Sequence, residues 1–302
     1  MSIYVEILVR APMDALWAHT QTPGLHERWD LRFSTIEYLS RIDDGSPQRF
    51  RYTTRIGFGC EVSGEGETTA HQDLPDGSST SALRFWSGAP LSIIREGSGY
   101  WKYIPTRDGV RFLTWYDYRT RFGSAGAVFD RLIFRPLIGW ATAWSFDRLR
   151  LWLEDRLDPG VALRHTFIHV VARLALVGVF AYQGVVPKLL VRHPDEIAMV
   201  EASGVATTLA SAAVTSMGVA ELLLAAALLA AWSRSWPVWV CVLAMPIATI
   251  IVALTSPAFF AAPFNPFSLN VSVAALAAVD LLVLPAIPCA GRCLRRPTSE
   301  KP

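Results

Sequence analysis

The chain has 302 residues, enough for two domains of ordinary size, and 52% of them are apolar. Its formal net charge of +2, without a basic stripe interleaved with aromatic residues, excludes nucleic acid as an expected partner. The mean hydropathy of +0.30 hides a sharp division along the chain. Residues up to about 158 mix charges, aromatics and glycine like a soluble domain, whereas residues 165–288 are mostly Ala, Leu, Val and Ile.

The beginning of the chain predicts a strand, two short helices and then several antiparallel strands. Residues 3–9 are rich in Ile, Val and Tyr, which favours a strand. Pro12 begins a helix that runs through His19, and a second short helix follows Pro23 and ends near Trp29. The strands after it are separated by the turn sequences DDGS, PDGS and RDG.

One long helix is predicted after Gly123, because apolar residues recur with helical period up to Leu157. Pro136 is expected to kink it. Its predicted apolar side consists of Phe129, Leu132, Ile133, Leu137, Trp140, Trp144, Leu151 and Leu153.

A set of large aromatic residues in this first part is the candidate lining of a ligand cavity: Trp29, Trp86, Trp115, Tyr116, Tyr118 and Trp140. Two interpretations stay open, since such residues usually fill a core, and a ligand site also needs convergent polar groups. The spacing of Ser, His, Cys and carboxylate residues shows no catalytic motif. Whether the chain is an enzyme therefore stays undecided.

Four apolar stretches in the second part are long enough to cross about 30 Å of hydrocarbon: 165–190, 206–232, 236–257 and 267–288. Pro187 is expected to end the first of these helices, and Lys188 to lie at the level of the lipid headgroups.

Lys and Arg near the ends of these stretches predict their orientation. Nine lie on one side: Arg148, Arg150, Arg156, Arg164, Arg234, Arg292, Arg295, Arg296 and Lys301. Only Lys188 and Arg192 lie on the other. This bias predicts a multi-pass protein of a bacterial-type inner membrane with both termini in the cytoplasm.

Ionisable residues inside the apolar stretches predict an intramembrane polar seam formed by His169, Arg173, Glu221 and Asp280. Charges in hydrocarbon are costly, so each should have a partner or water. Two interpretations compete. Either Arg173 neutralises Glu221 or Asp280 and the seam fixes helix packing, or the seam handles protons or holds a quinone headgroup.

No metal site is expected. Cys289 and Cys293 are four residues apart without a second pair for zinc, and adjacent residues such as His193, Asp195 and Glu196 rarely converge on one ion. The four cysteines are read as free thiols.

The first part resembles the SRPBCC superfamily, the START-like or polyketide-cyclase-like helix-grip fold. The resemblance is carried by the element order and by ILVRAP, LWAHTQTPGLHERWD and GWATAWSFDRLRLWLE. It implies an antiparallel sheet wrapped round the long C-terminal helix, with an apolar cavity for lipids, hormones or polyketide-like molecules. The superfamily has no universal catalytic residues to carry over.

The second part resembles the DoxX-like membrane family, chiefly in VFAYQGVVPKLLVRHPDE. Some relatives are membrane subunits of quinone-linked oxidoreductases, but this sequence has no redox motif of its own, so such a role rests on analogy. The resemblance makes a quinone the one cofactor to consider, and a redox subunit a partner to consider.

These observations predict an α+β helix-grip domain followed by an all-α bundle of four transmembrane helices. The expected boundaries are 1–157 for a START-like ligand-binding domain, 158–164 for a linker, 165–290 for the DoxX-like domain and 291–302 for a cytoplasmic tail. The expected partners are the lipid bilayer and a hydrophobic small molecule. The alternative function is that of a quinone-linked oxidoreductase subunit.

Overall fold

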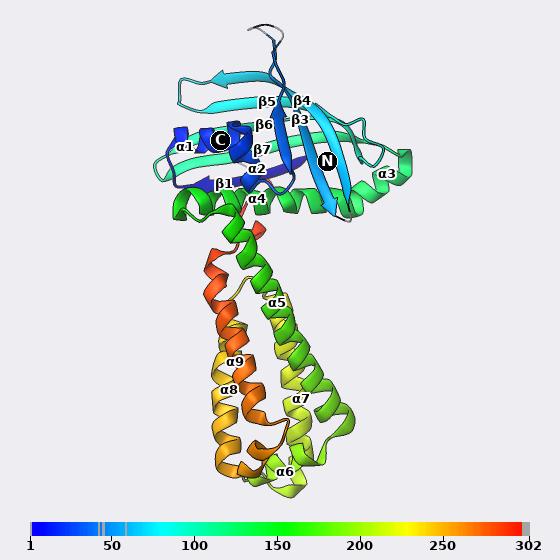
Figure 1. Ribbon diagram of the computed structural model, residues 1–302, viewed down its shortest axis with the longest axis vertical. Coiled ribbons are helices and arrows are strands. Elements are labelled where there is room, and N and C mark those ends of the chain that lie inside the picture. The colour runs from blue at the N-terminus through cyan, green and yellow to red at the C-terminus, as the bar shows by residue number, and fades with distance from the viewer. Residues whose placement is uncertain (1, 42, 44–45, 58, 298–302) are drawn as a thin grey trace. The chain divides into compact units, whose positions relative to one another are not determined.

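The computed structural model describes residues 2–41, 43, 46–57 and 59–297 (Figure 1). The chain forms two compact units. The first comprises the residues up to Ala162 together with the segment from Pro288 onward, and the second comprises Leu163–Ile287.

The first unit is built on one antiparallel sheet with the strand order β1-β7-β6-β5-β4-β3-β2. The strands are β1 (Ile3–Val9), β2 (Thr35–Tyr38), β3 (Arg49–Gly57), β4 (Cys60–Asp73), β5 (Ser79–Trp86), β6 (Ile94–Thr106) and β7 (Gly109–Thr120). Its helices are α1 (Met13–Gln21), α2 (Pro23–Trp29), α3 (Gly123–Phe129), the π-helix η1 (Asp130–Phe134), α4 (Arg135–Asp155) and the 3₁₀ turn η5 (Ala290–Arg292).

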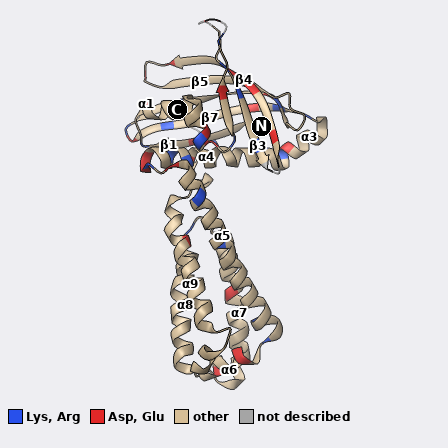
Figure 2. Ribbon diagram, in the orientation of Figure 1, with Lys and Arg blue, Asp and Glu red and all other residues tan. Residues whose placement is uncertain are grey.

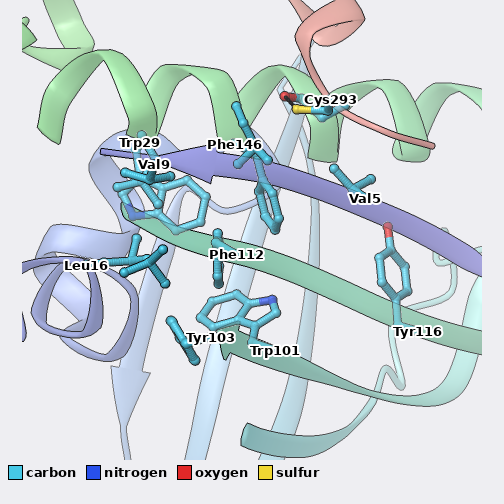
Figure 3. Packing of buried hydrophobic residues seen from close by; sticks show 14 of the residues in the cluster. Val5, Val9, Leu16, Trp29, Trp101, Tyr103, Phe112, Tyr116, Phe146 and Cys293 are labelled. Carbon is cyan, nitrogen blue, oxygen red and sulfur yellow. Dashed lines mark hydrogen bonds between the residues drawn. The ribbon is translucent and has the colours of Figure 1, made fainter. Parts of the chain in front are cut away.

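The long helix α4 covers one face of this sheet, and the core lies between them. Figure 3 shows Trp29, Trp101, Phe112 and Phe146 gathered in this space, and all four are buried. Alternate residues of β1 and β7 point into it, as the two-residue repeat of a strand requires. The arrangement confirms the predicted helix-grip domain.

The predicted apolar side of the long helix is only partly the buried side. Small residues form much of the face that packs on the sheet, among them Gly139, Thr142, Ala143 and Ser145. Several of the large apolar residues predicted for that side are exposed, namely Phe129, Leu132, Ile133, Leu137 and Trp140. Small side chains let a helix axis approach a sheet closely. The face of α4 that packs on the sheet is therefore not the face with the largest apolar side chains.

The segment from Pro288 onward is part of the first unit. Leu294 and Glu6 exchange backbone hydrogen bonds of 2.9 and 3.0 Å, which extends the free edge of β1. The Cys293 side chain is buried in the core, and its thiol donates to the Ala143 carbonyl at 3.2 Å. Buried Asp147 accepts hydrogen bonds from the Cys289 N–H and the Arg292 guanidinium, at 2.7 and 2.8 Å.

The second unit is helical. It contains α5 (Pro159–Gln183), which begins in the last residues of the first unit, the π-helix η2 (Gly184–Val191), α6 (Pro194–Ala202), α7 (Thr207–Ala230), α8 (Trp236–Thr255), the 3₁₀ turn η3 (Pro257–Ala261), α9 (Pro266–Val283) and the 3₁₀ turn η4 (Leu284–Ala286). In the described part of the chain, four helical segments are long and apolar enough to cross a membrane: Pro159–Val191, Thr207–Ala230, Trp236–Thr255 and Pro266–Ala286. Figure 2 shows few charged residues along α5, α7, α8 and α9. The predicted bundle of membrane helices is confirmed.

The first membrane helix does not end at Pro187, as the sequence suggested. It continues as η2 to Val191 and stops where Arg192 adopts the left-handed conformation with φ 51°. A π-helical stretch locally changes the hydrogen-bond pattern, so the missing proline N–H is tolerated there.

Candidate functional site

The inner face of the sheet, on the side of α4, carries aromatic residues that lie over glycines of the neighbouring strand. Phe50 pairs with Gly66, Tyr52 with Gly64, Phe85 with Gly97 and Tyr116 with Gly99. A Cβ added at Gly64, Gly66 or Gly97 would lie 2.3–2.5 Å from the ring of its partner, and one at Gly99 would lie 2.4 Å from the Tyr116 Cβ. The rings of Phe50, Tyr52 and Phe85 therefore lie along the sheet. We call these four pairs the aromatic–glycine floor.

Glycine is needed in this floor because any side chain at these positions would collide with a ring or a backbone carbonyl. A sequence signal for it exists in the alternating glycines of SGEG (63–66) and GSG (97–99). Two-residue spacing puts both glycines of each pair on one face of a strand. Sequence reasoning missed this signal.

Tyr116 and Tyr118 continue the inner face toward β7, where each tyrosine hydroxyl has a polar partner. The Tyr116 hydroxyl lies 3.0 Å from Thr142 Oγ1, and the Tyr118 hydroxyl donates to Asp130 Oδ1 at 2.6 Å. Burial and this bond to a carboxylate raise the pKa of Tyr118 well above its usual range. Burial alone raises the pKa of Tyr52 to about 12. The phenols of Tyr52 and Tyr118 are thus neutral at physiological pH.

Two guanidinium groups lie beside these tyrosines. Arg135 Cζ is 4.3 Å from the Tyr118 ring centroid, and Arg135 pairs with Asp130 and Asp117 at 2.7 and 2.8 Å. Arg32 Cζ is 5.8 Å from the Tyr116 ring centroid. Both side chains are only 13–16% exposed. Polar groups therefore converge on the aromatic face from both sides.

Arg32 is held by Asp30, which is buried and also faces His26 Nε2 at 3.0 Å. Burial raises the pKa of the Asp30 carboxyl, but the Arg32 charge and the hydrogen bonds from Arg32 and His26 outweigh it and hold that pKa well below its usual range. The His26 ring stacks on the Trp29 ring with a centroid distance of 4.9 Å. Through His26, the polar cluster of Asp30, Arg32 and His26 therefore contacts the aromatic core.

The structure separates the six aromatic candidates. Trp29, Tyr116 and Tyr118 are buried on the inner side. Trp115 alternates with Tyr116 and stacks on Tyr100 on the opposite face. Trp86 lines an open hollow of about 370 Å³ on that same outer face, beside Arg51 and Glu65. Trp140 is 44% exposed on α4. Facing depends on the register of each strand, which composition does not reveal.

A second candidate site lies within the helical bundle, where the structure joins three of the four seam residues. His169 Nδ1 lies 2.5 Å from Asp280 Oδ1, and Arg173 Nε lies 3.0 Å from Asp280 Oδ2. All three side chains are fully buried. Arg173 also donates to the Arg234 carbonyl at 3.1 Å, and Trp232 meets the His169 ring edge-on at 5.0 Å. We call His169, Arg173 and Asp280 the buried triad.

The polarity of the triad follows from its contacts. With a neutral imidazole, the Asp280 carboxylate accepts from Nδ1–H, so Nε2 carries the lone pair. Neither His169 Nε2 nor Arg173 Nη1 has a hydrogen-bond partner among the described residues. The site thus offers one basic nitrogen and one cationic donor.

Glu221 does not join this triad. Its carboxylate lies 3.1 Å from Lys188 Nζ, which also lies 3.5 Å from Glu196. Lys188 is only 5% exposed, so other parts of the protein cover its side chain. Gly184 and Gly218 bring η2 and α7 together here, since a Cβ on either would lie within 3 Å of the other's carbonyl oxygen.

Among the residues that the structure describes, no three His, Cys, Asp or Glu side chains are grouped so that they could hold a metal ion.

Comparison with known proteins supports the membrane assignment. Residues 177–278 match the model of the DoxX-like family. The uncharacterised membrane protein YndG of Bacillus subtilis (strain 168) is 50% identical over 183 residues, which cover 60% of this chain and 68% of YndG.

Solved structures resemble the first half. The di-domain ARO/CYC StfQ of the steffimycin biosynthetic pathway is 16% identical with a TM-score of 0.39, and the match covers 51% of each chain. This chain thus spans about half the length of StfQ. A STAR-related lipid transfer protein of Xanthomonas axonopodis is also 16% identical, with a TM-score of 0.38 over 50% of this chain and 85% of that one. Likenesses of this size carry no argument about ligand or activity.

Proposed function

This chain belongs to a family of membrane proteins with a DoxX-like domain, and on that premise we propose that its helix-grip domain binds a lipid-like or quinone-like small molecule. The aromatic–glycine floor is the observation that carries the proposal. Rings lying along a sheet offer a broad apolar surface to a ligand body, and the guanidinium groups of Arg32 and Arg135 offer donors to a polar end.

The proposal places the domain on the cytoplasmic side of a bacterial inner membrane. Four candidate spans separate the first part of the chain from the segment after Pro288, and both of these belong to one folded unit. An even number of membrane crossings leaves both of these segments on the same side of the membrane, as one folded unit requires. The excess of Lys and Arg near that side predicts that it is the cytoplasmic side.

Native mass spectrometry of the detergent-extracted full chain, with a panel of membrane lipids and quinones, tests the binding. We expect one bound apolar molecule, and we expect Phe85→Ala to weaken its retention several-fold because one ring of the floor is lost. Leu91→Ala is the matched control, since Leu91 is 59% exposed. Equal retention by both variants, or no bound molecule across the panel, would overturn the proposal.

A second candidate function is that of a membrane subunit of a quinone-linked oxidoreductase, with electrons supplied by a partner. The buried triad favours it, because a basic imidazole nitrogen beside a cationic donor suits proton exchange with a quinone headgroup. Quinone reduction by membranes with the native protein, with His169→Gln and without the protein is the test. Equal rates in all three membranes would exclude this function.

A further inference from the structure

An apolar stripe runs along the outward side of α3, η1 and the first turns of α4. Its large side chains are 42–68% exposed: Phe122, Val128, Phe129, Leu132, Ile133, Leu137 and Trp140. From Val128 onward they recur at intervals of three or four residues, so they share one side of the helix, and Phe122 lies immediately before α3. We call these seven residues the outer stripe.

The opposite side of the same helical segment makes the contacts that attach it to the rest of the domain. Gly126 and Asp130 are buried there, with Asp130 bonded to Tyr118 and Arg135, and Thr142 and Phe146 pack toward the sheet. The outer stripe is therefore not needed to hold the domain together. A contiguous exposed apolar face on a soluble domain indicates an interaction surface.

The charges around the stripe are basic. Residues 121–140 contain Arg121, Arg131 and Arg135, and their only acid is the buried Asp130. Arg135 is paired with Asp130 and with Asp117 of β7, so Arg121 and Arg131 supply the positive charge of this segment. The exposed residues Arg295 and Arg296 lie in the same unit, and Arg295 Nη2 occupies the space into which a Cβ on Gly139, next to Trp140, would project. Apolar side chains with tryptophan, bordered by bases and free of exposed acids, are typical of helices that lie in the headgroup layer of a membrane.

The chain itself tethers the domain that carries this stripe to a bilayer. Helix α4 ends at Asp155, and α5, which contains the first candidate span, begins at Pro159. Three intervening residues reach at most about 10 Å. A lipid surface is thus an apolar partner that is always available to this domain, without recruitment of a second molecule.

We propose that the outer stripe lies in the headgroup layer of the same membrane that the four helices cross, with Leu132 and Leu137 at its most deeply inserted part. The proposal rests on the membrane assignment and not on ligand binding, so it stands even if the aromatic–glycine floor is empty.

Spin-label accessibility in the full chain tests this placement. The exposed Cys60 and the half-buried Cys289 are first replaced by Ser. Single nitroxide labels are then attached at Leu132→Cys, at Leu137→Cys and, as a matched control, at Leu91→Cys, whose native side chain is about as exposed as that of Leu137 but lies outside the stripe. The protein is reconstituted in vesicles of phosphatidylcholine and phosphatidylglycerol. We expect the two stripe labels to collide more with oxygen than with a water-soluble nickel chelate, and Leu91→Cys to show the reverse.

Each other outcome overturns the proposal. Stripe labels as accessible to the nickel chelate as the control would mean that the stripe faces water. Labels shielded from both reagents would mean that a protein, such as a second copy of this chain, covers it. As an internal check, Leu132→Glu should make a label at Leu137→Cys several-fold more accessible to nickel while gel filtration of the protein is unchanged.

Discussion

Buried ion pairs are the main polar feature at the scale of single residues. In the bundle, Asp280 contacts both Arg173 and His169, and the Arg173–Asp280 ion pair is fully buried away from solvent. Such a pair adds little net stability, but removal of one partner leaves a charge uncompensated. The sequence indicated that Arg173 would meet an acid. It did not decide which one, because depth along separate helices does not fix their rotation.

Replacement of Arg173 is expected to destabilise the bundle strongly. Arg173→Met should cost about 3–5 kcal/mol, since Asp280 is then buried without its cationic partner. The double variant Arg173→Met/Asp280→Asn should recover most of this loss, because no charge remains unpaired. Thermal unfolding in detergent measures both, with the exposed Arg164→Met as control. Additive losses in the double variant would refute a direct pair.

Acid should weaken the helix-grip domain through Asp30. Its pKa in the folded state lies below the ordinary value of 3.8, so its stabilising effect is present above pH 3.8 and is lost as pH falls below it. The difference in unfolding free energy between the native protein and Asp30→Asn should therefore shrink from pH 7 to pH 3. Denaturant titrations followed by tryptophan fluorescence measure it. A difference that stays constant between pH 7 and pH 3 would count against the pairing of Asp30 with Arg32.

At the scale of elements, the sequence predicted the strands and helices better than their faces. Tyr116 and Tyr118, which are two residues apart in β7, both lie on the buried face of the sheet. Trp86 and Trp115 were grouped with them only because they are large and aromatic. The buried side of α4 was predicted only in part: Trp144 and Leu151 are buried as expected, but much of the packing depends on small residues such as Gly139 and Ala143, whereas hydrophobic periodicity follows the bulky ones.

Glycines in β6 should be intolerant of even one methyl group. A Cβ at Gly97 would lie 2.5 Å from the Phe85 ring and 2.7 Å from the Asp117 carbonyl oxygen. Gly97→Ala should therefore cost about 1–3 kcal/mol, as overpacking does. Gly88→Ala is the control, because nothing lies within 4 Å of its added Cβ. Chemical denaturation compares the two, and equal stability would mean that Phe85 does not lie over Gly97.

At the scale of the whole molecule, the first domain is built from two separate parts of the sequence. The segment after Pro288, expected to be a tail, supplies Cys293 to the core and Leu294 to the edge of β1. No local pattern reveals this, because the Cys293–Ala143 contact joins residues 150 positions apart and Leu294 pairs with Glu6 near the start of the chain. The membrane half was easier to predict, since length and hydropathy are local properties.

Loss of Asp147 should release this segment. Asp147→Ala removes the acceptor of the Cys289 N–H and of Arg150 and Arg292, which should cost about 3 kcal/mol. Burial raises the pKa of the Cys293 thiol to about 12, so alkylation at pH 8 should be slow in the native protein and many-fold faster in the variant. Peptide mass spectrometry reads this out, with Asp155→Ala as control. Unchanged Cys293 reactivity would show that Asp147 does not hold the segment.

We propose above that the inner face of the helix-grip domain receives an apolar molecule. Photo-crosslinking of the full chain in vesicles with a diazirine-labelled fatty acid, followed by peptide mapping, is the most direct test. We expect adducts on the inner-face residues Tyr52, Phe85 and Tyr116, with few on Trp115 of the opposite face. Adducts confined to the four membrane helices and the outer stripe would contradict it.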